Sequence, residues 1–358
     1  MIRRIYVAVM VVLMSVALLA QSPRAGAPTP PSQAELAARR QAYVDAQDKE
    51  RREITEPFWR KVSAGVMHME RITMKSRADG MEIPTWVFSP LTPRGPKAHA
   101  ALVWVHPDIR GYMYEYYAPY VIEAIRRGYA VIAPEYRGSV GYGTAHYDAI
   151  DYGGAEVDDV LTSLDYLKGM PIVDIDRVGI IGWSHGGMIT LLSAERSPKS
   201  FKAVAALVPV TNLFQRLSWN GDSYRRAIDP QNRTGGTPAE QKDVYKERSA
   251  IYGLDKIEAP VLVHITRNDG DVVIEEAMQL VDALRARRPL TSETRIYDAP
   301  KGGHLFDRQA PANDDQRPGV APPDPMDPAT YAPENTPEQR DSWNRVWTFL
   351  EWHLQPYR

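Results

Sequence analysis

The sequence predicts an α/β fold in which a mostly parallel central sheet is covered by helices on both faces. Three short apolar runs, at residues 99–106, 129–136 and 177–183, are continuous rather than alternating, as expected for strands buried on both faces. Residues 116–128 and 153–170 lie between these runs and carry apolar side chains at helical spacing. Alternating strands and helices favour a parallel sheet, because each helix packs back onto the sheet as a crossover connection.

Further elements extend this pattern in both directions along the chain. Residues 65–76 and 81–90 predict two strands joined by a turn that contains Gly80. Residues 33–54 carry charges and alanines at helical spacing and predict a largely solvated helix. Strands are expected at 202–210, 259–266 and 293–300, and helices at 272–287 and 337–354.

The N-terminus has the layout of a secretory signal peptide. Arg3 and Arg4 precede a mostly apolar run at residues 5–20, so we expect a signal peptide at 1–27 and a secreted or periplasmic protein. Cleavage after Ala20 or near the end of that range fits the small residues there. An uncleaved anchor is the alternative, although the run is shorter than the roughly 20 residues of a membrane span. After cleavage, no stable membrane partner is expected.

The remainder of the chain divides into three kinds of segment. Residues 28–65 are expected to form a linker and the N-terminal helix, and residues 66–358 one α/β domain. Within that domain, the polar and turn-rich residues 211–256 fit a possible lid insertion. Residues 307–337 are rich in Pro, Asp, Asn and Gln and predict a long loop, because they have little apolar surface to bury.

Composition excludes several classes of function. A formal net charge of -2 gives no field that attracts nucleic acid, so no nucleic-acid partner is expected. The chain has 0 cysteines, which removes thiol chemistry and cysteine-based metal sites. The acidic residues at 313–316 lack the ligand spacing of a calcium loop, and we predict neither a metal nor a cofactor. The oligomeric state is left open.

Ser184 lies between Gly182 and Gly186, where an apolar strand is expected to end and an apolar helix to begin. The hydroxyl of a serine there can cap the helix. The G-x-S-x-G spacing favours a different role, a nucleophile on a tight turn at the carboxyl end of a parallel strand. A serine nucleophile also needs a base and a third group that orients the base.

The base follows the acid in the chain order of such a sheet, and His304 and His353 lie late enough in the chain. His353 falls near the end of an aromatic-rich helix, where a packing or capping role is expected. His304 follows a predicted strand in a Gly-rich loop, so we predict that it is the base.

The acid is expected in the loop after the preceding strand, which offers Asp269 and Asp271. Asp269 stands nearer the strand end and is favoured. Asp271 is expected instead to cap the helix predicted to start at Val272.

The developing oxyanion needs hydrogen-bond donors. The first is expected to be the backbone N–H of His185, the residue after the nucleophile. The second normally comes from the loop after the strand at 99–106, where Pro107 has no N–H to donate. The backbone N–H of Asp108 or Ile109, or the side chain of Tyr112, is therefore the candidate.

Several separated segments resemble the catalytic domain of the prolyl oligopeptidase family of serine peptidases. "PEYRGSVGYG" resembles the family's Arg-Gly-Ser-x-Gly-Tyr-Gly stretch, "EVDDVLTSLDYL" its acidic helix before the nucleophile, and "DIDRVGIIGWSHGGMITL" its nucleophile segment. "APVLVHITRNDGDVV" and "GGHLF" resemble its acid and base segments. The resemblance covers about residues 66–304 and the last helix. It implies an α/β-hydrolase catalytic domain at 66–358 with Ser184 as nucleophile, Asp269 as acid and His304 as base.

The chain also departs from the family pattern. Peptidases of this family carry a β-propeller before the catalytic domain, and too few residues precede Val66 to build one. The family's usual loop after the third strand is replaced by "HPDIRG", which affects the oxyanion site.

Three functions are compared. A peptidase acting on short peptides is favoured by the motifs, whereas a carboxylesterase acting on small acyl esters is favoured by the two departures. A non-catalytic binding protein on the same scaffold is the third, although all triad members are present. The tyrosines at 112–120 either line a substrate groove or pack one helix face on the sheet.

Overall fold

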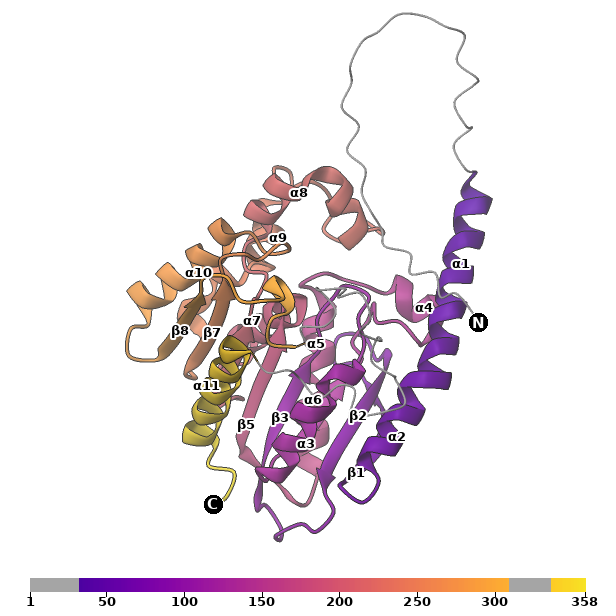
Figure 1. Ribbon diagram of the computed structural model, residues 1–358. Helices are drawn as coiled ribbons and strands as arrows, with labels where there is room; N and C mark the ends of the chain where they lie inside the picture. Colours follow the sequence, from indigo (N-terminus) through magenta and orange to yellow (C-terminus); the bar gives the residue numbers. More distant parts are fainter. Residues whose placement is uncertain (1–31, 309–335) are drawn as a thin grey trace, which may run out of the picture. The chain divides into compact units, whose positions relative to one another are not determined.

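An eight-stranded sheet runs through the protein in the order β1-β2-β4-β3-β5-β6-β7-β8. The structure is a computed structural model that describes residues 32–308 and 336–358 (Figure 1). Strands β3 to β8 are parallel, and β1 and β2 join them through antiparallel pairs. The bounds are β1 Met67–Lys75, β2 Glu82–Pro90, β3 His99–Val105, β4 Ala130–Pro134, β5 Val173–Trp183, β6 Ala203–Leu207, β7 Val261–Thr266 and β8 Ser292–Tyr297. The α/β-hydrolase fold and its mostly parallel sheet are thereby confirmed.

Helices fill both faces of this sheet. The α-helices of the described residues are α1 Gln33–Glu50, α2 Glu56–Ser63, α3 Ala118–Arg126, α4 Gly143–Asp148, α5 Ala155–Leu161, α6 Ser163–Gly169, α7 His185–Arg196, α8 Leu213–Ile228, α9 Lys242–Glu247, α10 Ile274–Arg287 and α11 Pro337–Leu354. Of these, α2, α3, α5, α6, α7, α10 and α11 cover the sheet. One helix was expected at 153–170, whereas the structure divides that segment into α5 and α6.

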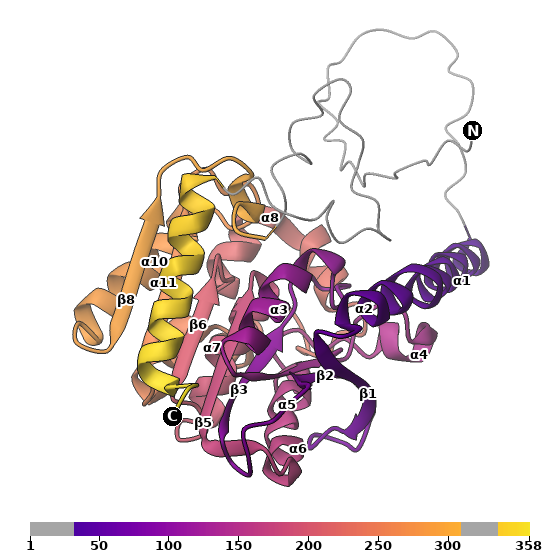
Figure 2. The same ribbon diagram turned by 60° about the horizontal axis from the view of Figure 1, so that its bottom comes forward.

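The sheet separates two hydrophobic clusters. Leu102 and Trp104 of β3 point into the cluster that α2, α3 and α11 cover, whereas Val103 and Val105 point into the one that α5, α6, α7 and α10 cover. Figure 2 shows α3 and α11 on the near side of the strands. Every residue of β3 is buried, which explains why its sequence is continuously apolar.

The N-terminal region differs from the expected domain boundary. Phe58 and Trp59 of α2 are fully buried among core residues that include Trp86 and Phe88, so α2 is part of the α/β domain rather than a linker. The chain divides into the units Met1–Arg40 and Gln41–Arg358. The compact unit with the sheet therefore begins before Val66. Helix α1 is largely exposed, as predicted, with Val44 as its buried residue.

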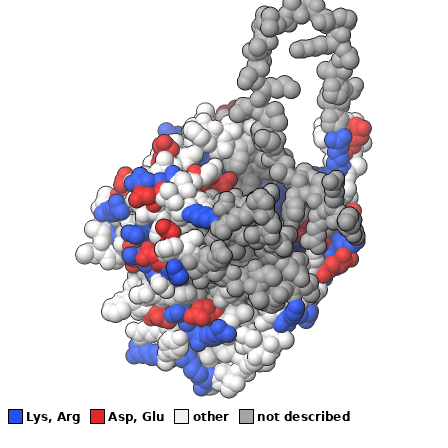
Figure 3. All heavy atoms as spheres, in the orientation of Figure 1, with Lys and Arg blue, Asp and Glu red and all other residues white. Residues whose placement is uncertain are grey.

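Two expected segments lie wholly or mostly outside the described residues, namely the signal peptide at 1–27 and the loop at 307–337. The possible lid insertion at 211–256 is described and carries α8 and α9. Helix α8 is kinked at Gly221, where φ is 74°. Across residues 32–308 and 336–358, each helix is too short or too polar to cross a membrane. Figure 3 shows basic and acidic side chains interspersed on the face it presents.

Candidate active site

Ser184 occupies a strained turn between β5 and α7. Its backbone has φ 55° and ψ -119°, a conformation that costs a non-glycine residue about 1–3 kcal/mol. Three hydrogen bonds hold it there: its N–H donates to the carbonyl of Leu207, and its carbonyl accepts from the N–H groups of Met188 and Val210. The turn lies at the carboxyl edge of the sheet, where the nucleophile was predicted.

The two glycines of the motif are required by close packing. A Cβ on Gly182 would lie 2.4 Å from the carbonyl oxygen of Gly186, and one on Gly186 would lie 2.3 Å from that of His106. Real Cβ atoms do not approach that closely, so larger residues would push β3, β5 and α7 apart. Gly186 also brings the start of α7 against the loop after β3, where the oxyanion donors are expected.

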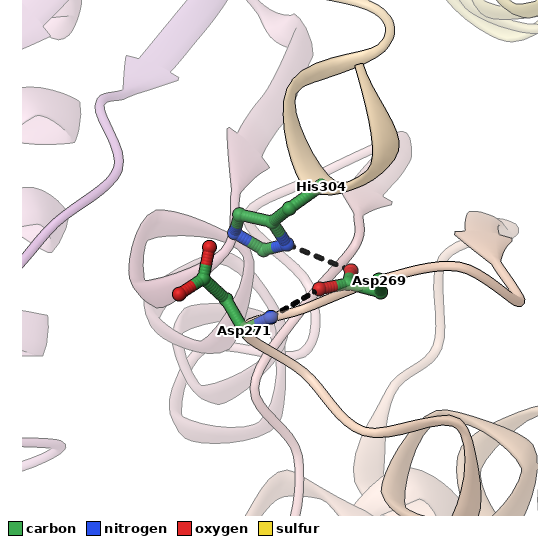
Figure 4. A group of neighbouring side chains, drawn as sticks. All are labelled: Asp269, Asp271 and His304. Carbon is green, nitrogen blue, oxygen red and sulfur yellow. Dashed lines mark hydrogen bonds and ion pairs between the residues drawn. The ribbon is translucent and has the colours of Figure 1, made fainter. Parts of the chain in front are cut away.

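Asp269 and His304 form a hydrogen-bonded pair at the same edge (Figure 4). Nδ1 of His304 lies 2.7 Å from Oδ2 of Asp269, and both side chains are largely buried. Asp269 follows β7, and His304 stands in a short 3-10 turn after β8. Because parallel strands end at one edge, β5, β7 and β8 bring Ser184, Asp269 and His304 to the same end of the sheet. Their catalytic roles stay predictions.

The expectation that Asp271 caps the next helix is wrong. Helix α10 begins at Ile274, and Val273 at its N-cap makes no side-chain cap. Oδ1 of Asp269 instead accepts the N–H groups of Asp271 and Val272, each at 2.8 Å. Figure 4 shows the carboxylate of Asp271 turned away from Asp269. Both oxygens of Asp269 are thus engaged, which fixes the orientation of its carboxylate.

Asn268 joins the loop after β7, which carries Asp269, to the loop after β8, which carries His304 and is called the base loop below. The sequence did not indicate this role. Its Nδ2 donates to the carbonyl of Pro300 at 3.0 Å. The base loop turns at Gly302 and Gly303, where φ is 95° and 49°. These left-handed conformations explain the glycines before His304.

His353, the alternative base, is on α11, and its ring packs edge-on against Phe349 at 4.8 Å. This contact confirms the packing interpretation for His353.

The loop after β3 turns sharply at Asp108, where φ is 70°. The hydroxyl of Tyr136 donates to the carbonyls of His106 and Asp108, and the hydroxyl of Tyr114 donates to Oδ2 of Asp108. Burial holds the pKa of Tyr114 well above its ordinary value, so this hydroxyl stays protonated. The main chain that carries the candidate N–H groups of Asp108 and Ile109 is therefore anchored by tyrosines.

Tyr112 is less suited to the oxyanion role than these backbone groups. Its hydroxyl donates to Oε2 of Glu115 at 3.4 Å, and the guanidinium of Arg51 lies 3.4 Å from the centre of its ring. Tyr117, from the same tyrosine-rich segment, is fully buried and packs edge-on against Trp104 at 5.3 Å. The packing interpretation of that segment therefore holds for Tyr117.

Two motif segments are linked by a buried ion pair. Arg137 of "PEYRGSVGYG" donates from its main-chain N–H, Nε and Nη2 to the carboxylate of Asp159 in "EVDDVLTSLDYL". Both side chains are buried. This pair holds the segment that carries Tyr136 against α5.

His185 is fixed by the same helix. Its Nε2 lies 3.0 Å from Oε1 of Glu156, and both side chains are buried. The ring of His185 therefore packs against α5. Its backbone N–H is the predicted first oxyanion donor, and the first N–H groups of a helix lack intrahelical acceptors.

Three side chains of the described residues lie close enough together to hold a metal ion. Asp269, Asp271 and His304 each offer a ligand atom, and these atoms lie within 4.8 Å of one another. Because Asp269 and His304 are hydrogen-bonded to each other, we interpret the group as an acid and base pair with an exposed acidic neighbour. The prediction that no metal or cofactor is used stays a prediction.

The comparison with protein families decides the classification. The profile described as the prolyl oligopeptidase family matches residues 116–318, more than half of the chain. The chain belongs to the prolyl oligopeptidase family. Curated relatives of this family member include the "Uncharacterized peptidase YuxL" of Bacillus subtilis, 28% identical over 64% of this chain and 34% of that protein. Another is the "Dipeptidyl-peptidase 5" of Porphyromonas gingivalis, 31% identical over 48% of this chain and 25% of that protein.

Solved structures show the same fold. A puromycin-hydrolysing peptidase of Mycobacterium tuberculosis superposes with a TM-score of 0.62 at 21% identity, over 80% of this chain and 39% of that one. An acylaminoacyl peptidase of Pyrococcus horikoshii has a TM-score of 0.61 at 20% identity, over 82% of this chain and 42% of that one. The chain spans about a quarter to a third of the length of the two curated relatives.

Proposed function

We propose that the protein is a secreted serine peptidase that hydrolyses short peptides through an acyl-enzyme on Ser184. The observation that carries this proposal is the hydrogen bond between Asp269 and His304, at the sheet edge that also holds Ser184 on its strained turn. Family membership supports the reaction class. The names of the relatives, among them a dipeptidyl-peptidase and an acylamino-acid-releasing enzyme, support peptide substrates.

The proposed reaction begins with proton transfer from Ser184. A carboxylate can only accept, so Nδ1 of His304 carries the proton shared with Asp269, and Nε2 is left as the base. Ser184 Oγ attacks the scissile carbonyl while Nε2 takes its proton. The N–H of His185 and one N–H of the loop after β3 stabilise the oxyanion. His304 then protonates the leaving group, and water attacks the acyl-enzyme by the reverse sequence.

Peptides and esters make different demands on this site. An amine leaving group has to be protonated as it departs, whereas an alkoxide or phenolate leaves more readily. The fixed orientation of the Asp269 carboxylate supports efficient proton delivery by His304 and therefore a peptidase. A carboxylesterase is the second candidate, because Pro107 removes one N–H from the loop after β3.

The test is paired hydrolysis of a short-chain p-nitrophenyl ester and a panel of chromogenic peptidyl amides. Ser184→Ala removes the nucleophile, and Ser193→Ala is its matched control. Ser193 is buried in α7, and its hydroxyl has no hydrogen-bond partner within the described part of the chain. Amide cleavage that is lost in Ser184→Ala and kept in Ser193→Ala supports the peptidase. Ester cleavage without amide cleavage establishes the esterase, and the absence of both favours the binding protein.

Export rests on the sequence alone. The basic residues Arg3 and Arg4 before an apolar run support a cleaved signal peptide. Fractionation of the producing cells and N-terminal sequencing of the mature protein test it. We expect the protein outside the cytoplasm with a new N-terminus between Gln21 and Pro28, whereas an intact Met1 on a cytoplasmic protein would contradict export.

A further inference from the structure

We propose that Asp307 is a positioning residue that holds the catalytic base in register with the nucleophile. Its carboxylate accepts the indole N–H of Trp183, the residue directly before Ser184. In the chain, Leu305 and Phe306 separate Asp307 from His304. The inference rests on the proposed function, because it assigns Asp307 a part in the same reaction.

The Asp307 contacts connect three elements. Nε1 of Trp183, at the end of β5, lies 3.2 Å from Oδ2 of Asp307. Nε1 of Trp343 on α11 donates to the main-chain carbonyl of Asp307 at 2.7 Å. The relative exposure of Asp307 is 0%, so water does not compete for these bonds. One buried residue therefore ties the nucleophile strand and the C-terminal helix to the base loop.

Arg308 completes the arrangement. Its Nη2 donates to the main-chain carbonyl of His304, and its Nε lies 3.7 Å from Oδ1 of Asp307. Burial raises the pKa of Asp307, while the charge of Arg308 and the hydrogen bond from Trp183 act in the opposite direction. Removing two charges from water is costly, and an apolar pair of similar volume often packs at least as well. Asp307 and Arg308 are charged here because their polar groups bind Trp183 and the main chain of the base loop, which an apolar pair could not do.

The hydrogen bond to Trp183 complements the contacts that the base loop makes with the acid side of the site. Asp269 and Asn268 connect the loop to the segment after β7, and Gly302 and Gly303 give its backbone wide conformational freedom. The bond to Trp183 is made directly to the strand that carries Ser184. Catalytic groups have to be held within about 0.5 Å, and a misplacement of about 1 Å can cost about 100-fold in rate.

Trp104 provides a matched control for the indole of Trp183. It lies on the neighbouring strand β3, is equally buried, and its ring centre is 5.0 Å from that of Trp183. Its Nε1 has no hydrogen-bond partner in residues 32–308 and 336–358. Replacing either tryptophan with phenylalanine removes similar volume from one cluster, but only the change at Trp183 removes a bond to Asp307.

The experiment compares Trp183→Phe and Trp104→Phe in the full chain. We measure the rate constant for labelling by a fluorophosphonate, and kcat and KM for the p-nitrophenyl ester. In Trp183→Phe we expect labelling and kcat to fall by about tenfold to 100-fold while KM stays within about twofold. In Trp104→Phe both are expected to stay within about threefold. Near-ultraviolet circular dichroism checks that each variant is folded.

A second pair of variants keeps the inference testable if Trp183→Phe does not fold. Asp307→Asn retains an oxygen that accepts the indole N–H, whereas Asp307→Ala removes it. The Asn variant is expected to label at least about fivefold faster than the Ala variant. Equal rates in this pair, or equal losses in the two tryptophan variants, would overturn the positioning role. Wild-type protein that does not label at all contradicts the proposed function itself and removes the basis of this inference.

Discussion

Nδ1 of His304 lies 2.7 Å from Oδ2 of Asp269, while Oδ1 of the same carboxylate accepts the N–H groups of Asp271 and Val272. The acid is therefore held by its own loop on one oxygen and orients the base with the other. This division leaves the imidazole one favourable tautomer, with the lone pair of Nε2 available to Ser184.

Asp269→Asn is expected to lower kcat by about 10⁴ with little change in stability. An amide can occupy the same space but does not stabilise the imidazolium or enforce its tautomer, and a loss of this size is known for the equivalent change in a serine protease. Ester hydrolysis under steady-state conditions measures it. Asp271→Asn changes the exposed acid two residues along and serves as the control, with kcat within about threefold. Similar losses in both variants would contradict the assignment of the acid.

Gly186→Ala is expected to disrupt both folding and activity. The added Cβ would lie 2.3 Å from the carbonyl oxygen of His106, so the elbow and the loop after β3 would have to separate. We expect the free energy of unfolding to fall by about 2–4 kcal/mol, with a large loss of ester hydrolysis. At Gly169, the last residue of α6, a Cβ meets nothing within 4 Å. Gly169→Ala is the control and should leave the free energy of unfolding unchanged or slightly higher. A Gly186→Ala variant with wild-type stability and activity would refute the packing argument.

Arg137→Lys tests the buried pair that joins the two motif segments. Lysine cannot make the forked contact with Asp159, which leaves a buried carboxylate poorly matched, and we expect a loss of about 3–5 kcal/mol in the free energy of unfolding. Urea denaturation measures this loss. Arg77→Lys alters a more exposed pair with Asp165 and should cost less than about 1 kcal/mol. Equal losses in the free energy of unfolding at the two sites would show that burial does not strengthen the Arg137 pair.

Glu195 predicts a dependence of stability on pH. Burial raises the pKa of this α7 carboxyl to about 8, although the charges of Lys256 and Arg196 oppose the change. The folded state then binds a proton that the unfolded state releases above its ordinary pKa of about 4.3, so stability should fall as pH rises between these two values. Relative to Glu195→Gln, the wild type should lose on the order of a few kcal/mol between pH 5 and pH 8. Parallel curves for the two proteins in denaturant titrations would show that Glu195 does not titrate in this way.

The sheet could be predicted from the sequence because strands that are buried on both faces have continuously apolar sequences. The runs that form β3, β4 and the second half of β5 are almost continuously apolar, and the glycines around Ser184 mark a close approach that the structure confirms. Helix α2 falls outside the predicted domain, because that prediction begins at residue 66 with the first expected strand. Its docking depends on the partners Trp86 and Phe88, which the local sequence does not identify.

Supporting contacts of the site were harder to predict, because they join residues far apart in the chain. The hydroxyl of Tyr136 donates to the carbonyl of Asp108, and the carboxylate of Glu156 lies against the ring of His185. Neither the residue types nor their spacing in the sequence predicts these contacts. The Asp271 prediction failed for a related reason. Aspartate before a helix commonly caps it, but α10 begins at Ile274, so Val273 rather than Asp271 occupies the N-cap position.

The most direct test of the central claim is the pre-steady-state reaction of the protein with a p-nitrophenyl ester. We expect a burst of p-nitrophenol close to one equivalent per chain, with the acyl group found on Ser184 by mass spectrometry of the quenched protein. The burst should disappear in Ser184→Ala and persist in Ser193→Ala. Ester turnover with no burst and an acyl group on another residue, or no turnover at all, would contradict a serine hydrolase that acts through Ser184.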